Sequence, residues 1–241
     1  MIRAFDVDNP QLTLSDVAKR TNLTRAAARR FLLTLEQLGY VRSDRKLFAL
    51  RPSVLELGFS YLSSLGLPEI STPHLETLVQ EVQQSSSVSV LDGTDIIYVA
   101  RVAMRRIMSV NITVGTRLPA YSTSMGRALL AELDAVQLDA YFAAAELSPI
   151  TAHTVTDEKK LREVLVEVRE QGWALVDQEL EHGLRAIAVP LHDASGRAVA
   201  AINVSLPSVN YTREETLSDV LPPLRRAVAH IETDYRAIDK L

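Results

Sequence analysis

Residues 11–41 read QLTLSDVAKRTNLTRAAARRFLLTLEQLGYV, and their spacing decides the fold of the first part of the chain. The spacing predicts a short helix over Leu14–Arg20, a turn over 21–23 and a longer helix from Thr24 to about Leu38. Thr24 is the expected N-cap, because its hydroxyl can accept a hydrogen bond from a free N–H of the first turn. Two helices joined by such a turn are typical of a helix-turn-helix.

Apolar residues recur every three or four positions along the second helix and define the face expected to pack inward. They are Ala27, Phe31, Leu35 and Leu38, with Val17 and Ala18 of the first helix as expected partners. The start of the second helix then points away from the core. In a helix-turn-helix these N-terminal residues reach base edges in the major groove. The residues expected to contact DNA are Thr24, Arg25, Ala26, Arg29 and Arg30.

A predicted β-hairpin follows the second helix directly. Gly39 is a typical helix-ending glycine, and two short strands, 40–42 and 46–50, flank a polar turn. A hairpin at this place is a wing, whose tip can reach phosphates or the minor groove. The cations expected to do so are Arg42, Arg45 and Lys46. An ordinary amphipathic helix pair with a solvated basic face remains the alternative, and the wing argues against it.

The composition limits the class of protein. The 241 residues are enough for two domains, and 47% of them are hydrophobic, which suffices for packed cores. Cysteine is absent, so disulfides and thiolate metal sites are excluded. No apolar run is long enough to span a membrane, and no signal peptide is recognisable. We therefore expect a cytoplasmic protein without membrane association.

The net charge of −4 conceals an uneven distribution. Residues 1–51 contain ten basic and five acidic residues, whereas residues 52–241 contain 16 basic and 25 acidic residues. Attraction to phosphate acts over about a Debye length, roughly 8–10 Å. An acidic C-terminal part therefore does not cancel the attraction of a basic N-terminal part for DNA.

The chain is expected to divide into a winged helix-turn-helix domain over 1–51, a linker helix over 52–66 and a larger domain over 67–241. Residues 1–8 resemble the last turn or two of a helix that begins earlier. The linker helix carries one continuous apolar stripe, formed by Val54, Leu57, Gly58, Tyr61, Leu62 and Leu65. This stripe predicts pairing with the same helix of a second chain; the alternative is packing on its own C-terminal domain.

The C-terminal part alternates between helical and strand patterns. Helices are expected over 70–84, 124–133, 135–145, 157–171 and 212–238, the last broken or bent near Pro222 and Pro223. Hairpins are expected over 87–100 and 186–206, with further strands over 108–114, 117–121 and 173–176. Antiparallel strands with helices outside them predict an α+β domain with one curved sheet.

Sequence signatures of catalysis are missing. The chain has no nucleophile elbow, phosphate loop, dinucleotide fingerprint or paired-histidine zinc motif. Its five histidines are scattered singly, without a second ligand at a metal-binding interval. We therefore expect no catalytic residue, no metal and no cofactor, and the chain is not expected to be an enzyme.

Three segments of the C-terminal part suggest a binding pocket. A strand ends at Tyr121 and a helix begins near Ser124, where free N–H groups favour a carboxylate and Gly126 would allow close approach of a ligand. An acidic loop from Asp177 leads into an apolar strand. Asn203 shares one strand face with Ser205, which suits an oxygen-rich ligand. An ordinary capped helix, a solvated turn and an exposed sheet face remain the alternatives.

The whole chain resembles the IclR family of bacterial transcriptional regulators. The helix-turn-helix with its wing carries the resemblance, together with GTRLPAYSTSMGRALLA (115–131), DQELEHGLRAIAVPL (177–191) and AAINVSL (200–206). The resemblance is strongest to the branch that controls aromatic-acid breakdown through protocatechuate and β-ketoadipate. It implies a GAF-like effector-binding domain, a small organic acid as effector, operator DNA as partner, and dimers or pairs of dimers.

Carried over onto this sequence, the implied ligand region includes Met125, Gly126, Asp177, Ala186, Asn203 and Ser205. With Tyr121 and Ser124 these residues form the candidate effector site. Two alternatives stay open. One is a regulator of the same family that answers glyoxylate, pyruvate or a sugar acid, and the other is an enzyme acting on such acids.

Overall fold

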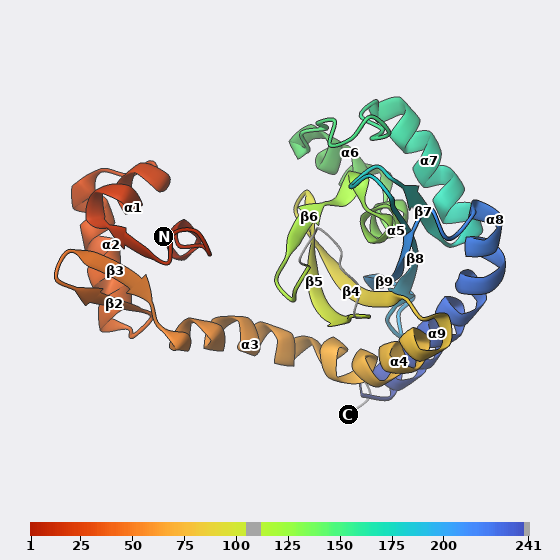
Figure 1. Ribbon diagram of the computed structural model, residues 1–241, viewed down its shortest axis with the longest axis horizontal. Coiled ribbons are helices and arrows are strands. Elements are labelled where there is room, and N and C mark those ends of the chain that lie inside the picture. Colours follow the sequence, from red (N-terminus) through yellow and green to blue (C-terminus); the bar gives the residue numbers. More distant parts are fainter. Residues whose placement is uncertain (105–111, 239–241) are drawn as a thin grey trace. The chain divides into compact units, whose positions relative to one another are not determined.

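The computed structural model describes residues 1–104 and 112–238 (Figure 1). The chain divides into two compact units, Met1–Leu65 and Gly66–Leu241. The first unit contains a 3-10 turn (Ile2–Ala4), β1 (Gln11–Thr13), α1 (Leu14–Arg20), α2 (Arg25–Gln37), β2 (Val41–Asp44), β3 (Leu47–Leu50), a second 3-10 turn (Pro52–Val54) and α3 (Leu55–Leu65). The predicted helix pair and wing are therefore confirmed.

Local hydrogen bonds explain the helix boundaries of this unit. The Thr24 hydroxyl accepts a 3.2 Å hydrogen bond from the Ala27 N–H and caps α2. Thr13 and Asp16 form a reciprocal capping box at the start of α1. Gly39 has φ +83°, the left-handed conformation that glycine adopts without steric cost. The short strand β1 was not predicted; it pairs with β3 and extends the wing into an antiparallel sheet of order β1-β3-β2.

The predicted inward face of α2 is wrong at Phe31 and Leu38, whereas Leu35 packs against the core and the predicted partners Val17 and Ala18 are buried. Phe31 is 44% exposed and Leu38 is 62% exposed, whereas Ala28 and Leu32 are fully buried. One residue corresponds to a rotation of about 100°. The run Phe31-Leu32-Leu33 makes the register ambiguous, and the core selects the burial of Leu32. That core consists of Ala4, Phe5, Leu12, Val17, Leu32 and Val41.

The second unit has the expected α+β architecture. Its helices are α4 (Leu67–Val82), α5 (Ser124–Glu132), α6 (Ala135–Ala144), α7 (Glu158–Gln171), α8 (Arg213–Glu215) and α9 (Leu221–Ile238). Its strands are β4 (Ser85–Asp92), β5 (Asp95–Val102), β6 (Arg117–Pro119), β7 (Ala174–Asp177), β8 (Leu184–His192) and β9 (Ala198–Pro207). They form one antiparallel sheet of order β6-β5-β4-β9-β8-β7.

The two faces of this sheet are covered by different helices. Helices α4 and α9 pack on one face and α5 packs on the other (Figure 1). Ala188 belongs to the hydrophobic cluster with α5, and its register partner Asn203 therefore lies on the same face. Strand alternation places Ile202 and Val204 on the opposite face, toward α4 and α9. The sheet thus separates an apolar layer from a layer that also contains polar groups.

One predicted strand of this unit falls outside the described residues, another needs correction, and the predicted break in the last helix is confirmed. The predicted strand 108–114 lies largely outside the described residues. The strand predicted over 117–121 ends at Pro119 and continues as a 3-10 turn over Ala120–Ser122. The C-terminal helix is interrupted by a π-helical segment, Thr216–Val220, just before the two prolines. Among the described residues, no helix is long and apolar enough to cross a membrane.

Candidate functional site

The start of α2 and the wing form a basic surface on the first unit. All eight predicted DNA contacts are exposed: Thr24, Arg25, Ala26, Arg29, Arg30, Arg42, Arg45 and Lys46. Among the described residues, none of these six cations takes part in an ion pair, whereas Arg20 on α1 is paired with Asp6. Exposed and uncompensated cations are available for phosphates and base edges.

The wing is tied to the recognition helix. The Glu36 carboxylate on α2 accepts a 3.1 Å hydrogen bond from the Ser43 N–H on β2, and the Ser43 hydroxyl also donates to it. Arg45 has φ +56° and occupies the hairpin turn with Lys46. The same carboxylate therefore fixes the wing next to α2, so both can approach one duplex together.

The second unit contains a small cavity between the N-terminal end of α5 and the sheet. It measures about 20 Å³, which holds about one water molecule. Seven apolar or aromatic residues, three serines, one threonine and one asparagine line it: Tyr98, Ile112, Ser122, Thr123, Ser124, Met125, Val176, Leu180, Leu184, Ala186, Asn203 and Ser205. Five of the eight predicted effector residues are therefore brought together here: Ser124, Met125, Ala186, Asn203 and Ser205.

Two buried polar atoms of this lining lack a partner within the described residues. They are Ser124 Oγ and Asn203 Oδ1, and these residues are 2% and 3% exposed. Asn203 Nδ2 donates a 3.2 Å hydrogen bond to Ser205 Oγ, so only its oxygen remains unsatisfied. A buried polar atom without a partner destabilises a fold by roughly 1–3 kcal/mol. Such atoms are retained where a ligand or water completes them.

Sequence reasoning missed a second group of polar residues beside the cavity. Ser87 on β4 is the register partner of Asn203, and its hydroxyl accepts a 3.0 Å hydrogen bond from Arg101 Nη1. No carboxylate pairs with Arg101 among the described residues, and burial lowers the pKa of its guanidinium. The sequence signal that could have revealed this group is the alternation of Ser85, Ser87 and Ser89 along one strand. The other face of that strand is too apolar to be exposed, so the serines had to be buried as well.

A strand irregularity places a tyrosine on this face as well. Tyr98 and Arg101 are three residues apart and would point to opposite sides of a regular strand. A register shift between Val88 and Ser89 brings Tyr98 opposite Ser89 and Arg101 opposite Ser87. Burial raises the pKa of Tyr98 to about 12.

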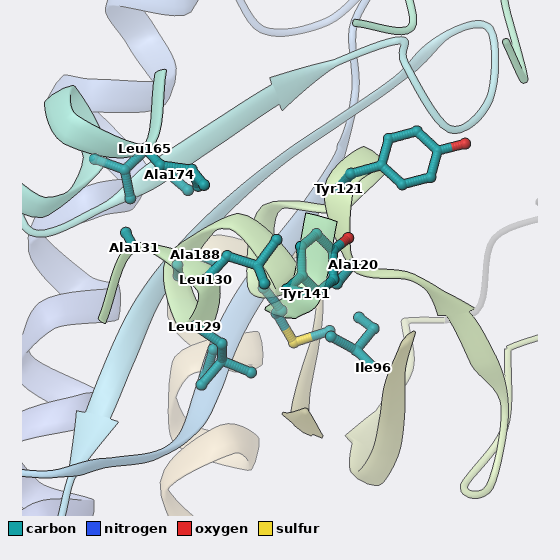
Figure 2. Close-up of a cluster of buried hydrophobic side chains, with 14 of the residues drawn as sticks. Ile96, Ala120, Tyr121, Leu129, Leu130, Ala131, Tyr141, Leu165, Ala174 and Ala188 are labelled. Carbon is teal, nitrogen blue, oxygen red and sulfur yellow. The ribbon is translucent and has the colours of Figure 1, made fainter. Parts of the chain in front are cut away.

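Three predicted effector residues lie outside the cavity lining. The Tyr121 hydroxyl donates a 2.6 Å hydrogen bond to the Ser148 carbonyl, and Figure 2 shows its ring directed away from the core side chains around Leu129. Asp177 Oδ2 accepts from Arg185 Nη2 at 2.6 Å, across the strand from cavity-facing Val176.

The expected role of Gly126 in ligand approach needs correction. A Cβ at this position would lie 2.1 Å from the Ala120 carbonyl oxygen. The backbone that comes close to Gly126 is therefore that of the chain itself, where the 3-10 turn packs on the first turn of α5. Gly126 shapes the cavity indirectly by allowing this contact.

Comparison with known proteins assigns the chain to a family. Residues 1–45 match the IclR helix-turn-helix domain, and residues 59–233 match the C-terminal domain of bacterial transcriptional regulators of the IclR type. The chain belongs to the IclR family. It is therefore a DNA-binding transcriptional regulator and not an enzyme.

This IclR-family regulator is similar in sequence and structure to several known proteins. It is 45% identical to the Pca regulon regulatory protein of Pseudomonas putida, over 94% of this chain and 78% of that protein. It is 54% identical to a transcriptional regulator from Rhodococcus sp. RHA1 of known structure, with a TM-score of 0.85, 98% of this chain and 95% of that one being covered. An IclR homologue from Microbacterium hydrocarbonoxydans, solved in complex with 4-hydroxybenzoate, is 27% identical with a TM-score of 0.83 and coverages of 98% and 95%.

Proposed function

We propose that this IclR-family regulator controls genes of aromatic-acid catabolism and that an aromatic acid in the α5 cavity modulates its DNA binding. The observation that carries the proposal is the pair of unsatisfied buried atoms, Ser124 Oγ and Asn203 Oδ1, in an otherwise mainly apolar cavity. The similarity to a Pca regulon regulator and to a 4-hydroxybenzoate-bound homologue supports the choice of acid. Because such regulation acts on bacterial genes, we also propose that the protein works in the cytoplasm.

The surroundings of the cavity offer a counterpart for each part of such a ligand. The free N–H groups and partial positive charge at the start of α5 favour a carboxylate, and Ser124 supplies a hydroxyl there. Arg101, beside Ser87, offers a cationic side chain for the carboxylate in addition to the start of α5. Apolar side chains, including Met125 and Leu184, suit the faces of an aromatic ring.

The size of the cavity also favours a second candidate. At about 20 Å³ the space is too small for a benzoate ring, so side chains of the lining must move to admit one. Glyoxylate or pyruvate requires a smaller displacement. An IclR-type regulator of a short keto acid is therefore the alternative, and a panel of acids distinguishes the two.

We further propose that the regulator acts as a dimer joined through α3, or as a pair of such dimers. Four large apolar residues of this helix are 47–72% exposed: Leu55, Leu57, Phe59 and Tyr61. Leu57 and Tyr61 belong to the predicted stripe, Leu55 and Phe59 form a second pair on another side of the helix, and exposed apolar surface marks an association site. Two recognition helices would then meet operator half-sites about 34 Å apart, one turn of the duplex. In sedimentation, Leu57→Glu should dissociate the dimer, whereas Glu56→Gln on the same helix should not.

The effector assignment is tested by thermal shift with protocatechuate, 4-hydroxybenzoate, β-ketoadipate, pyruvate and glyoxylate. The expected result is a rise in melting temperature with one or both aromatic acids, because a ligand that binds only the folded state stabilises it by mass action. A rise with a keto acid alone would select the second candidate. No shift with any acid would contradict both.

A matched substitution tests the cavity itself. Asn203→Leu keeps the approximate shape and removes the unsatisfied oxygen, so the ligand-free protein should be as stable as the wild type or more stable. The same variant should lose most of the acid-induced shift. Val204→Ala, on the opposite face of the same strand, should lower stability but keep the shift. Retention of the full shift by Asn203→Leu would remove the cavity from the effector site.

A further inference from the structure

A buried ion pair joins the first turn of α5 to the segment that leads from β7 into β8. Arg127 and Glu179 are 3% and 7% exposed. Their contact is bidentate, with Nη1 to Oε1 at 2.7 Å and Nη2 to Oε2 at 2.5 Å. Arg127 Nε also donates to the Tyr121 carbonyl at 2.7 Å. Fork-to-fork geometry of this kind fixes orientation as well as distance.

Glu179 also anchors a second loop. Its Oε2 accepts a 2.9 Å hydrogen bond from the Val155 N–H, and its carbonyl oxygen accepts a 2.7 Å hydrogen bond from the Thr154 hydroxyl. The Thr151 hydroxyl donates to the Gln178 carbonyl at 2.7 Å. The Glu179 carboxylate therefore connects Arg127 of α5 with Val155, and the backbone carbonyls of residues 178 and 179 hold the rest of this loop.

The segment that carries Glu179 forms one wall of the cavity. We call residues 178–184 the cover segment, because Leu180 and Leu184 both line the cavity. It begins and ends near residues with positive φ, Gln178 at +60° and Gly183 at +78°. The cavity behind it is too small for an aromatic acid, so the lining must open during binding.

We infer that Arg127 and Glu179 are positioning residues that hold the cover segment closed, so that separation of this pair controls entry and release of the effector. This inference rests on the proposed function. Both charges are buried, so the closed position is strongly preferred when the bidentate contact is intact. Opening must break or move this contact, since Glu179 lies between Gln178 and Leu180 on the same segment. Neither residue touches the ligand space, and both act through the cover.

The first experiment needs no ligand. Glu179→Gln keeps the shape of the side chain but weakens the pairing with Arg127, and Arg127→Lys keeps the charge but loses the bidentate contact. Backbone hydrogen exchange should accelerate about tenfold in residues 151–155 and 178–184 together, as expected for loss of a charge-assisted hydrogen bond. Exchange in α4 and α9 should stay unchanged. Unchanged exchange in both loops, or an equal rise throughout the unit, would overturn the inference.

The second experiment measures stopped-flow binding of 4-hydroxybenzoate to the intact protein. Both association and dissociation should be faster in the Glu179→Gln variant, by about tenfold each, because the closed cover limits both steps. A merely structural loss would speed dissociation alone. Two controls separate the effects: Ile187→Val, which is buried on the far face, lowers stability only, and Glu158→Gln weakens an exposed ion pair on α7.

The effector assignment and the role of the ion pair are contradicted by different results. If the wild type binds no aromatic acid, the effector assignment fails, and hydrogen exchange alone then decides whether the ion pair holds the cover. If the wild type binds the acid and Glu179→Gln leaves the association rate unchanged or lowers it, the cover does not gate the cavity.

Discussion

The two units of this regulator carry their functional residues in opposite environments. In the first unit the expected DNA contacts lie exposed at the start of α2 and on the hairpin, six of the eight are cations, and local sequence determines where they lie. In the second unit the candidate effector groups are buried oxygens, positioned by strand pairs far apart in sequence, such as Ser87 with Asn203. The sensing side therefore depends on precise packing between distant segments, whereas the DNA-binding side depends on which side chains its surface carries.

The largest expected effect is that of Gly126→Ala. The new Cβ would lie 2.1 Å from the Ala120 carbonyl oxygen and 2.4 Å from its Cα, so the start of α5 must move. We expect the second unit to lose about 3 kcal/mol or more, measured by calorimetric unfolding. Gly58→Ala on α3, where nothing lies within 4 Å, should instead stabilise by about 0.5–1 kcal/mol. If the Gly126→Ala variant melted at the same temperature as the wild type, the contact between residue 126 and Ala120 would be less tight than proposed.

The next effect concerns the recognition helix. Arg29→Ala should reduce affinity for the operator by about 5- to 150-fold, equivalent to about 1–3 kcal/mol, because it removes a base or phosphate contact. Fluorescence anisotropy with the native upstream DNA measures the loss. Thermal shift by the effector should not change, since Arg29 belongs to the other unit. Arg162→Ala on α7 is the control, and equal loss of DNA affinity in both variants would count against α2.

A smaller effect is expected at the wing. Lys46→Ala should weaken binding to operator and random DNA by similar factors, because a phosphate contact carries no sequence information. The slope of log affinity against log salt concentration should fall in magnitude by about 0.9. A change confined to the operator would mean that Lys46 reads bases.

The smallest expected effect is on the pH dependence of the stability of the second unit. The Ser195 hydroxyl, together with the N–H groups of Arg197 and Ser195, lowers the pKa of Asp193 to about 2, against an ordinary value of 3.8. A carboxyl with a lowered pKa stabilises the fold above its unfolded pKa, and this contribution disappears as the pH falls through the folded pKa. In urea unfolding, the difference between wild type and Asp193→Asn should be constant above about pH 5 and shrink toward pH 2. A difference that grows in acid would contradict the assignment.

Much of the fold could be predicted because local rules and tertiary packing agree. Thr24 caps α2 and Gly39 ends it, as the residue types require. The inward face of α2 could not be chosen reliably, because three consecutive apolar residues fit the helical period in more than one register. Phe5 and Leu12, which complete the core around Leu32, lie outside the helix pair from which that face was inferred.

The candidate site was predictable only where a single segment supplies it. Ser124 follows from the start of a helix, and Asn203 with Ser205 follows from strand alternation, whereas Met125 and Ala186 came from the family resemblance alone. Arg101 could not be found this way, because its position depends on a register shift in a hairpin. Gly126 was assigned the wrong neighbour, since only the folded chain shows that Ala120 occupies the adjacent space.

Strand β4 has one further consequence for regulation. Ser87 faces the effector side, while Val88 faces the side covered by α4, and Gly66 alone separates α4 from α3 in the sequence. A displacement of β4 on its effector side would therefore reach α4 on the other face of the sheet. A flexible insert of several glycines between Leu65 and Gly66 should therefore leave effector binding and DNA binding intact while abolishing the effect of the effector on DNA affinity.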